Sequence, residues 1–138
     1  MPAPIVVTLH HVALPVSDVG RSRRFYADVL GLREIERPAA FDFPGAWFTV
    51  GDGQLHLIER VGGTLRTGKP LDSRDVHFAI RVADFEGMVE HLHSRGYRDD
   101  LGPLDACWMR INRRPNAGFP QIFLADPDSH VIEINATA

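Results

Sequence analysis

Two histidines begin apolar stretches that read almost the same way. His11 opens the stretch His-Val-Ala-Leu-Pro-Val-Ser-Asp, and His77 opens the later stretch His-Phe-Ala-Ile-Arg-Val-Ala-Asp. A repeat of this kind indicates that one supersecondary unit occurs twice. Imidazole is a frequent ligand of divalent metals, so each copy begins with a candidate metal ligand.

Apolar and polar residues alternate in both stretches, and this predicts which way the two histidines face. Every second residue is apolar from Val12 in the first stretch and from Phe78 in the second. Neighbours along a β-strand point to opposite faces of the sheet. The apolar residues make the better core face, so we expect His11 and His77 to point away from the core.

Two further candidate ligands lie between apolar neighbours. Glu133 stands between two isoleucines and His56 between two leucines, so both also point away from the core. A carboxylate in apolar surroundings costs several kcal/mol unless a charge or water compensates it, and a metal ion supplies that charge. Two histidines with one or two carboxylates suit Ni, Zn, Mn, Fe or Co. The sequence therefore predicts one divalent metal ion, with the ligands His11, His56, His77 and Glu133.

The fourth ligand has an alternative in Glu59. Residues 50–59 and 124–133 align without gaps, which pairs Glu59 with Glu133. His56 and Glu59 are three apart, so in a regular strand only one of them can face the metal. We favour His56, because its Leu-His-Leu pattern matches the Ile-Glu-Ile pattern around Glu133, whereas Glu59 adjoins a linker.

The elements that position these residues follow the same order twice. Either Ser17 or Asp18 stands where the N-cap of a first helix belongs, Asp84 stands where that of a second belongs, and glycines follow both helices. We expect helices over residues 21–30 and 85–94 and strands over residues 9–16, 34–37, 46–50, 54–59, 76–82, 108–112, 120–124 and 130–135.

Length and composition predict one compact domain. With 138 residues, 44% of them hydrophobic, the chain is long enough for one core and too short for two conventional domains. We therefore expect an α+β fold of two tandem β-α-β-β-β modules, over about residues 8–60 and 76–136, joined by a linker over residues 61–75.

Charge and hydropathy exclude several classes of partner. The net charge is −3 and no basic stripe is present, which argues against nucleic acid and anionic membranes as partners. No apolar run approaches the ~20 residues of a membrane span, and the amino terminus lacks the pattern of a signal peptide. The single cysteine, Cys107, is typical of a reducing compartment, and we interpret it as a small core residue. We expect a cytoplasmic protein that binds a small molecule.

The chain resembles the vicinal oxygen chelate superfamily, which contains glyoxalase I, bleomycin-resistance proteins, fosfomycin-resistance thiol transferases and extradiol dioxygenases. The resemblance covers nearly everything from Leu9 to Asn135 and is strongest in residues 11–14, 25–26, 30–32, 123–128 and 131–133. It implies one domain over residues 1–138, in which two modules form a curled mixed sheet around a metal-binding cup, often in a homodimer. Family ligands lie on the first and last strand of each module, which correspond to His11, His56, His77 and Glu133.

The resemblance implies a glyoxalase-like enzyme of the lyase or isomerase type, which stabilises an enolate or oxyanion of a small chelating substrate. Glu133 and His56 are then the catalytic candidates. Bacterial glyoxalase I usually has Glu or Gln at the position of His56, which leaves Glu133 as the one carboxylate able to act as general base.

Three alternatives stay open. The first is a fosfomycin-type thiol transferase, although no cationic cluster for a phosphonate stands out. The second is a single-domain extradiol dioxygenase. The third, which is not an enzyme, is a metal-free binding protein of the bleomycin-resistance type that sequesters a drug. The metal set argues against this last class.

Candidate substrate-binding residues lie in or beside the strands that form the cup, and they give an aromatic cleft with a few polar groups. Tryptophans are more often core residues, and Arg110 is equally suited to solvent. The candidates are Trp47, Trp108, Arg110, Asn112 and Gln121. The sequence leaves open whether one chain or two complete the cup.

Overall fold

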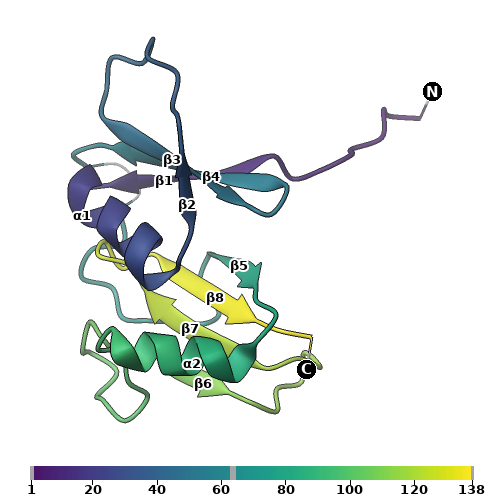
Figure 1. Cartoon of the computed structure of the whole chain (residues 1–138), viewed down its shortest axis with the longest axis vertical. Helices are drawn as coiled ribbons and strands as arrows, with labels where there is room; N and C mark the ends of the chain where they lie inside the picture. Colours follow the sequence, from purple (N-terminus) through teal and green to yellow (C-terminus); the bar gives the residue numbers. More distant parts are fainter. Residues whose placement is uncertain (1, 63–64, 138) are drawn as a thin grey trace.

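Two four-stranded sheets make up the fold in the computed structural model, which describes residues 2–62 and 65–137 (Figure 1). The first sheet has the strand order β1-β4-β3-β2. Its strand β1 runs parallel to β4, and the other neighbours are antiparallel. The strands are β1 (His11–Val16), β2 (Arg33–Ile35), β3 (Gly45–Val50) and β4 (Gly53–Glu59).

The second sheet repeats this arrangement with the order β5-β8-β7-β6. Here β5 runs parallel to β8 and the other neighbours are antiparallel. Its strands are β5 (His77–Arg81), β6 (Arg110–Asn112), β7 (Gln121–Ala125) and β8 (Val131–Asn135). The predicted α+β class and the repeated β-α-β-β-β order are confirmed, although one chain holds two separate curled sheets and not a single continuous one.

Each sheet has its own helix, and both helices begin at the predicted caps. The Asp18 carboxylate accepts a hydrogen bond from Arg21 N at the start of α1 (Val19–Arg24), and Asp84 accepts one from Gly87 N at the start of α2 (Phe85–Ser94). The first helix differs from the prediction, because after Arg24 it widens into the π-helical segment η1 (Phe25–Val29). Gly31, with φ of 70°, ends it.

One apolar core joins the two sheets on their helix-bearing sides. The helix α2 buries Phe85, Val89 and Leu92, and the segment η1 buries Phe25 and Tyr26 in the same cluster. The remaining core comes from alternate strand residues, including Phe48, Leu55, Leu57, Ile122, Leu124, Ile132 and Ile134. The opposite faces of the two sheets therefore point away from this shared core.

Buried hydrogen bonds fix the turn between β7 and β8 against the first half of the chain. The Tyr26 hydroxyl donates to Asp126 Oδ2 at 2.7 Å, and the Ser17 hydroxyl donates to Asp128 Oδ1 at 2.6 Å. His130 Nε2 donates to the Pro15 carbonyl at 2.7 Å. Burial raises the pKa of Asp126, and the hydroxyl of Tyr26 and two backbone N–H groups partly offset that effect.

No helix in the described part of the chain is both long and apolar enough to cross a membrane.

The bond between Tyr26 and Asp126 is expected to hold the two halves together. Tyr26→Phe leaves the buried carboxylate without its hydroxyl donor, so the free energy of unfolding should fall by about 1–3 kcal/mol. Urea unfolding measures this change. Tyr97→Phe serves as the control, because the Tyr97 hydroxyl forms no hydrogen bond with any described residue. Equal losses in both variants would contradict the assigned role.

Candidate metal centre

The first pair of candidate ligands lies on the outward face of the first sheet. His11 is the register partner of Gln54 in β4, and His56 lies two residues further along that strand. The two imidazole rings stack with centroids 4.1 Å apart and planes at 18°. Trp47, which pairs with His56 across β3 and β4, stacks on the other face of the His56 ring at 3.9 Å and 4°. The His56 ring is therefore held between Trp47 and His11.

This environment favours neutral imidazole. Burial lowers the pKa of His56, and electrostatic repulsion from the neighbouring His11 ring lowers it further. His56 Nε2 lies 2.8 Å from the amide oxygen of Gln54, which can only accept, so Nε2 carries the proton of the neutral ring and Nδ1 keeps a free lone pair. Neutral imidazole is the form that binds metals.

The second pair lies on the outward face of the second sheet. His77 Nε2 and Glu133 Oε1 are 3.4 Å apart, and Glu133 is only 7% exposed. His77 Nδ1 lies 2.8 Å from the Asp75 carbonyl, to which it must donate. Asn135 donates to Glu133 Oε2 at 2.7 Å and accepts from Arg81 Nε at 2.8 Å. Each member of the pair is thus oriented by a hydrogen bond on its far side.

The geometry of His77 and Glu133 fits a divalent metal. Ligand bonds of about 2.0–2.1 Å in a tetrahedral site place two donor atoms about 3.4 Å apart. The donation from His77 Nδ1 leaves Nε2 as the atom that faces Glu133, and such a hydrogen bond to a carbonyl is typical of metal-ligating histidines. Imidazole nitrogen and carboxylate oxygen are donors that suit the first-row divalent ions.

The register of the strands decides which residue of β4 corresponds to Glu133. Glu133 lies two residues beyond Val131, the register partner of His77, and His56 lies two residues beyond Gln54 in the same relation to His11. His56 is therefore the equivalent of Glu133, and the gapless alignment that pairs Glu59 with Glu133 is wrong by three positions.

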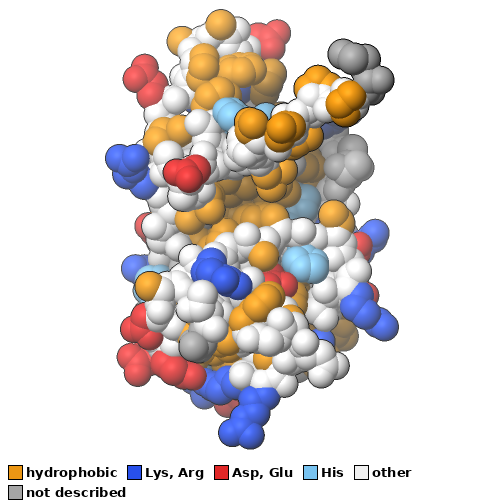
Figure 2. Space-filling view, turned by 90° about the vertical axis from the view of Figure 1, so that its right-hand side faces the viewer, with side chains coloured by type: hydrophobic (Ala, Val, Ile, Leu, Met, Phe, Trp, Pro, Cys, Tyr) orange, Lys and Arg blue, Asp and Glu red, His pale blue; other side chains and the backbone are white. Residues whose placement is uncertain are grey.

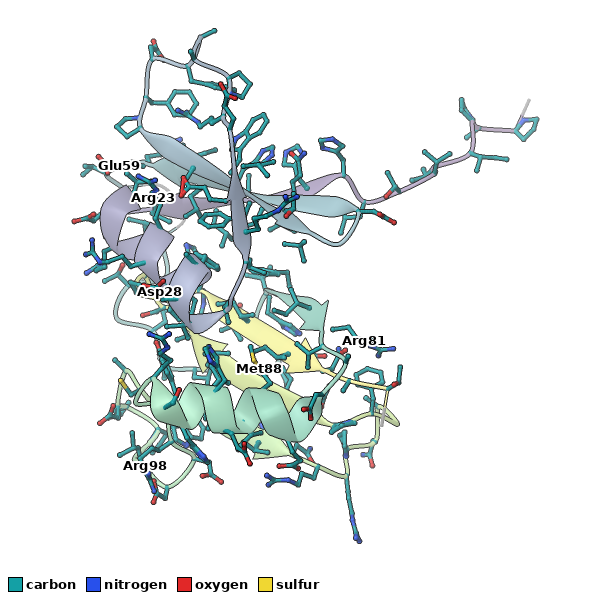
Figure 3. The ribbon with its side chains drawn as sticks, viewed as in Figure 1. Arg23, Asp28, Glu59, Arg81, Met88 and Arg98 are labelled. Atoms are coloured by element: carbon teal, nitrogen blue, oxygen red, sulfur yellow. The ribbon has the colours of Figure 1, made fainter. Side chains whose placement is uncertain are left out.

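Glu59 has a structural role at the first helix (Figure 3). Its Oε2 accepts a hydrogen bond from Val19 N at 3.0 Å, at the start of α1. The free N–H groups and the positive end of the helix dipole favour a carboxylate there.

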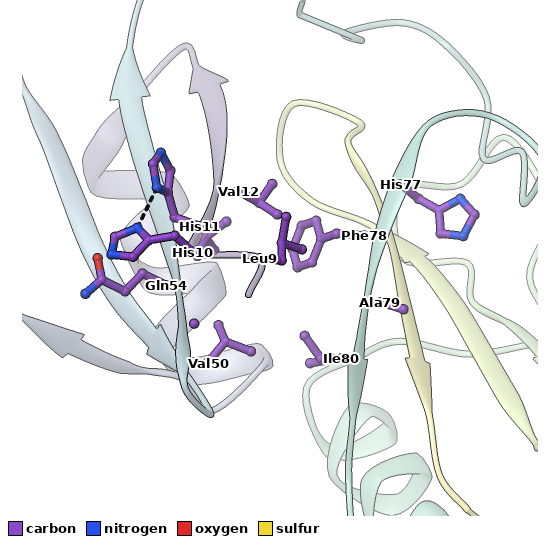
Figure 4. Close-up of a pocket in the computed structure, with 12 residues that line it drawn as sticks. Leu9, His10, His11, Val12, Val50, Gln54, His77, Phe78, Ala79 and Ile80 are labelled. Carbon is purple, nitrogen blue, oxygen red and sulfur yellow. Dashed lines mark hydrogen bonds between the residues drawn. The ribbon is translucent and has the colours of Figure 1, made fainter. Parts of the chain in front are cut away.

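The two pairs do not meet within one chain. No group of three or more His, Cys, Asp or Glu side chains that could hold a metal occurs among residues 2–62 and 65–137. Figure 4 shows why: Leu9, Val12, Phe78 and Ile80 line a cleft of about 400 Å³ between β1 and β5, and the rings of His11 and His77 point to opposite sides of it. The predicted ligands therefore form two half-sites, His11–His56 and His77–Glu133.

Four of the five predicted substrate-binding residues share a face with a half-site. Trp47 contacts His56 directly. In the second sheet, Arg110 and Phe123 are register partners, as are Phe123 and Glu133, so Arg110 shares the face of Glu133. The same pairing carries Asn112, Gln121 and Asn135 to that face.

The fifth residue, Trp108, lies elsewhere. It precedes β6 and lines a separate cavity of about 170 Å³ with Pro70, Leu71 and Ser129. The Arg110 side chain also turns toward the linker, where it donates to the Ser73 hydroxyl at 3.1 Å. Neither side chain forms a hydrogen bond or ring stack with a candidate ligand among the described residues.

Three residues that orient the candidate ligands are not apparent from metal chemistry alone. His10 lies beside His11, with 2.9 Å between their Nδ1 atoms. Gln54 and Asn135 contact His56 and Glu133 respectively, each from two residues away on the same strand. For Gln54 and Asn135, period-two alternation was the available signal, because it places residues i and i+2 on one face.

Comparison with known proteins places the chain in a family. The model of the Glyoxalase/Bleomycin resistance protein/Dioxygenase superfamily matches residues 8–134, so the chain belongs to that superfamily. It is 29% identical over 130 residues to "Glutathione transferase FosA" of Serratia marcescens, an alignment that covers 93% of this chain and 79% of the relative.

Solved structures share the fold. A glyoxalase family protein from Bacillus anthracis matches with a TM-score of 0.75 and 19% identity, with 99% of each chain covered. The fosfomycin resistance protein FosX from Listeria monocytogenes matches with a TM-score of 0.70 and 18% identity over 97% of this chain and 96% of FosX. Lactoylglutathione lyase from Agrobacterium tumefaciens gives 0.68 and 18% over 96% and 95%.

The indole of Trp47 is expected to set the titration of His56. Trp47→Ala hydrates the imidazole and weakens the desolvation that lowers its pKa, so the pKa of His56 should rise toward the ordinary value. Titration of the ring signals by NMR measures the shift. Trp108→Ala, in the separate cavity, should leave that titration where it is, and an unchanged pKa in Trp47→Ala would show that the stacked indole has no such effect.

Proposed function

We propose that the protein is a divalent-metal-dependent enzyme of the glyoxalase type, and that two copies of the chain complete its metal site. The observation that carries the proposal is the pair of equivalent half-sites on outward faces, His11–His56 and His77–Glu133. A twofold axis that sets the first sheet of one chain against the second sheet of another brings unlike half-sites together. Such a dimer contains two complete sites.

Exposed apolar residues beside the first half-site support a second copy as the partner. The described segment before β1 is extended, and the side chains of Ile5, Val6, Val7 and Leu9 are 78–89% exposed. Figure 2 shows apolar side chains of this projecting segment continuing toward the hollow between the two halves. A cluster of this kind at the surface is typical of an interaction site.

The residues of the complete site divide the chemistry between them. A divalent ion there supplies stabilisation for negative charge that develops on a chelated substrate oxygen. Glu133 is the one carboxylate among the four candidates, so it is the group able to accept a substrate proton. Asn135 fixes its Oε2, and its Oε1 faces His77 Nε2. His56, which is neutral and backed by Trp47, acts as a fourth ligand or as a base behind the other three.

Metal content tests the proposal directly. Protein purified without chelators or a metal-affinity tag should contain about one equivalent of Ni, Zn, Mn, Fe or Co per chain. Glu133→Ala should lose that metal while the helices persist, because Glu133 lies off the core face. Elemental analysis and far-ultraviolet circular dichroism give the two readouts.

Glu59→Ala is the matched control for this variant. Glu59 lies on β4, the last strand of the first sheet in sequence order, as Glu133 lies on the last strand of the second. Its carboxylate binds Val19 N at the start of α1, so Glu59→Ala should leave the metal content unchanged. Full metal content in Glu133→Ala would contradict the assignment of Glu133 as a ligand. A metal-free wild-type protein with a normal fold would favour a binding protein that sequesters a drug.

Mixed dimers test whether two chains share the site. His11→Ala and Glu133→Ala should each lose the metal. When the two variant chains, carrying different peptide tags, are refolded together, the purified mixed dimer should hold one metal per dimer, against two in the wild type. One site combines the intact His11–His56 half-site of the Glu133→Ala chain with the intact His77–Glu133 half-site of the His11→Ala chain. The other site contains both altered half-sites.

Two changes in the same half-site give the control. In a mixed dimer of His77→Ala with Glu133→Ala, the His77–Glu133 half-site is altered in both chains. Neither metal site is then complete, so this dimer should hold no metal. The same absence of metal in the His11→Ala and Glu133→Ala mixture would mean that one chain builds its own site.

A thiol transferase is the second candidate, and the likeness to a protein named glutathione transferase FosA favours it. The half-sites suit it equally, because its substrate would also chelate the metal. Assays of the metal-loaded protein separate the reactions: turnover of a hemithioacetal supports the glyoxalase type, and addition of a thiol to an epoxide supports the transferase. Turnover of a catechol with oxygen would indicate a single-domain dioxygenase.

A further inference from the structure

A buried guanidinium lies behind the second half-site. Arg66, in the segment before β5, is only 6% exposed. Its Nη2 and Nε atoms donate to Asp75 Oδ2 at 2.8 and 3.1 Å, and Nη2 also lies 3.2 Å from the Pro70 carbonyl. Its Nη1 donates to the Ser129 carbonyl. Arg66 thus joins two segments that are far apart in the sequence.

The two segments lead into the strands that carry the second pair of ligands. Asp75 is two residues before His77, and its carbonyl accepts the proton of His77 Nδ1 at 2.8 Å. Ser129 is four residues before Glu133, in the turn into β8, and has φ of 68°. Strands β5 and β8 are parallel neighbours, so a group that holds the backbone just before each strand also holds the spacing between His77 and Glu133.

We propose that Arg66 is a positioning residue for His77 and Glu133. Through Asp75 it places the carbonyl that keeps the His77 proton on Nδ1, which leaves Nε2 bare and directed at Glu133. Through Ser129 it fixes the turn from which β8 begins. The consequence for metal binding rests on the function proposed above, whereas the effect on the His77 ring does not.

An arginine suits this role because its donors form a planar fork. One edge of the guanidinium binds the Asp75 carboxylate while another nitrogen reaches the carbonyl of Ser129, which a single ammonium cannot do in one geometry. The Asp75 carboxylate also accepts from Val76 N at 2.8 Å. The backbone between Asp75 and His77 is therefore fixed from both sides of the acceptor carbonyl.

The test reads the His77 ring in the metal-free protein. In protein labelled with ¹⁵N, at a pH well above the imidazole pKa, the nitrogen shifts should show the proton of His77 on Nδ1. In Arg66→Met the ring should shift toward a mixture of both tautomers. Zn²⁺ alone, added to the same samples, should bind about 10–100-fold more weakly to the variant than to the wild type.

Arg74→Met is the matched control. Arg74 lies in the same linker and pairs with Asp72 at 3.8 Å, but its side chain is 92% exposed. Its removal should leave the His77 tautomer and the Zn²⁺ affinity at wild-type values. Equal changes in both variants would reduce the effect to general loosening of the linker and overturn the proposal.

Other outcomes are equally decisive. A folded Arg66→Met protein that keeps His77 fully protonated on Nδ1 overturns the proposal. If Arg66→Met does not fold, Asp75→Asn replaces it, since this variant keeps the contacts of Arg66 with the two carbonyls and should shift the tautomer in the same direction. A tautomer shift in a protein whose wild type binds no Zn²⁺ supports the role of Arg66 and refutes the proposed metal site.

Discussion

The contact between the β7–β8 turn and the first helix determines how the rest of the molecule can be used. Tyr26 binds Asp126 and Ser17 binds Asp128 across the two halves, and both acceptors are buried. These directional bonds, together with the shared apolar core, hold the helix-bearing sides of the sheets against each other. The polar faces of the sheets are consequently presented outward, where another molecule can reach them.

Sequence patterns predicted the local part of this arrangement well. Alternation gave the facing of His11, and acidic residues before the helices gave their starting points, because both signals depend only on neighbours along the chain. Such local signals could not predict the orientation of one sheet against the other. It depends on bonds such as the one from Tyr26 to Asp126, which join residues 100 positions apart.

The roles of single polar residues were predicted less evenly. His56 was chosen over Glu59 from the pattern of its neighbours, and the strand register supports that choice. The capping bond of Glu59 to Val19 was missed, because nothing local marks a partner that lies 40 residues away. Arg66 was likewise indistinguishable from a solvated linker residue, since its hydrogen bond to the Ser129 carbonyl joins residues 63 positions apart.

The divergence of the two repeats at one position has an electrostatic consequence. His56 and Glu133 occupy equivalent places, yet one is a neutral ring and the other an anion. In the proposed metal site, a divalent ion with three neutral imidazoles and one carboxylate would retain about one unit of positive charge, whereas two carboxylates would cancel it. In the proposed site, the imidazole at position 56 would thus favour ligands that bring negative charge of their own.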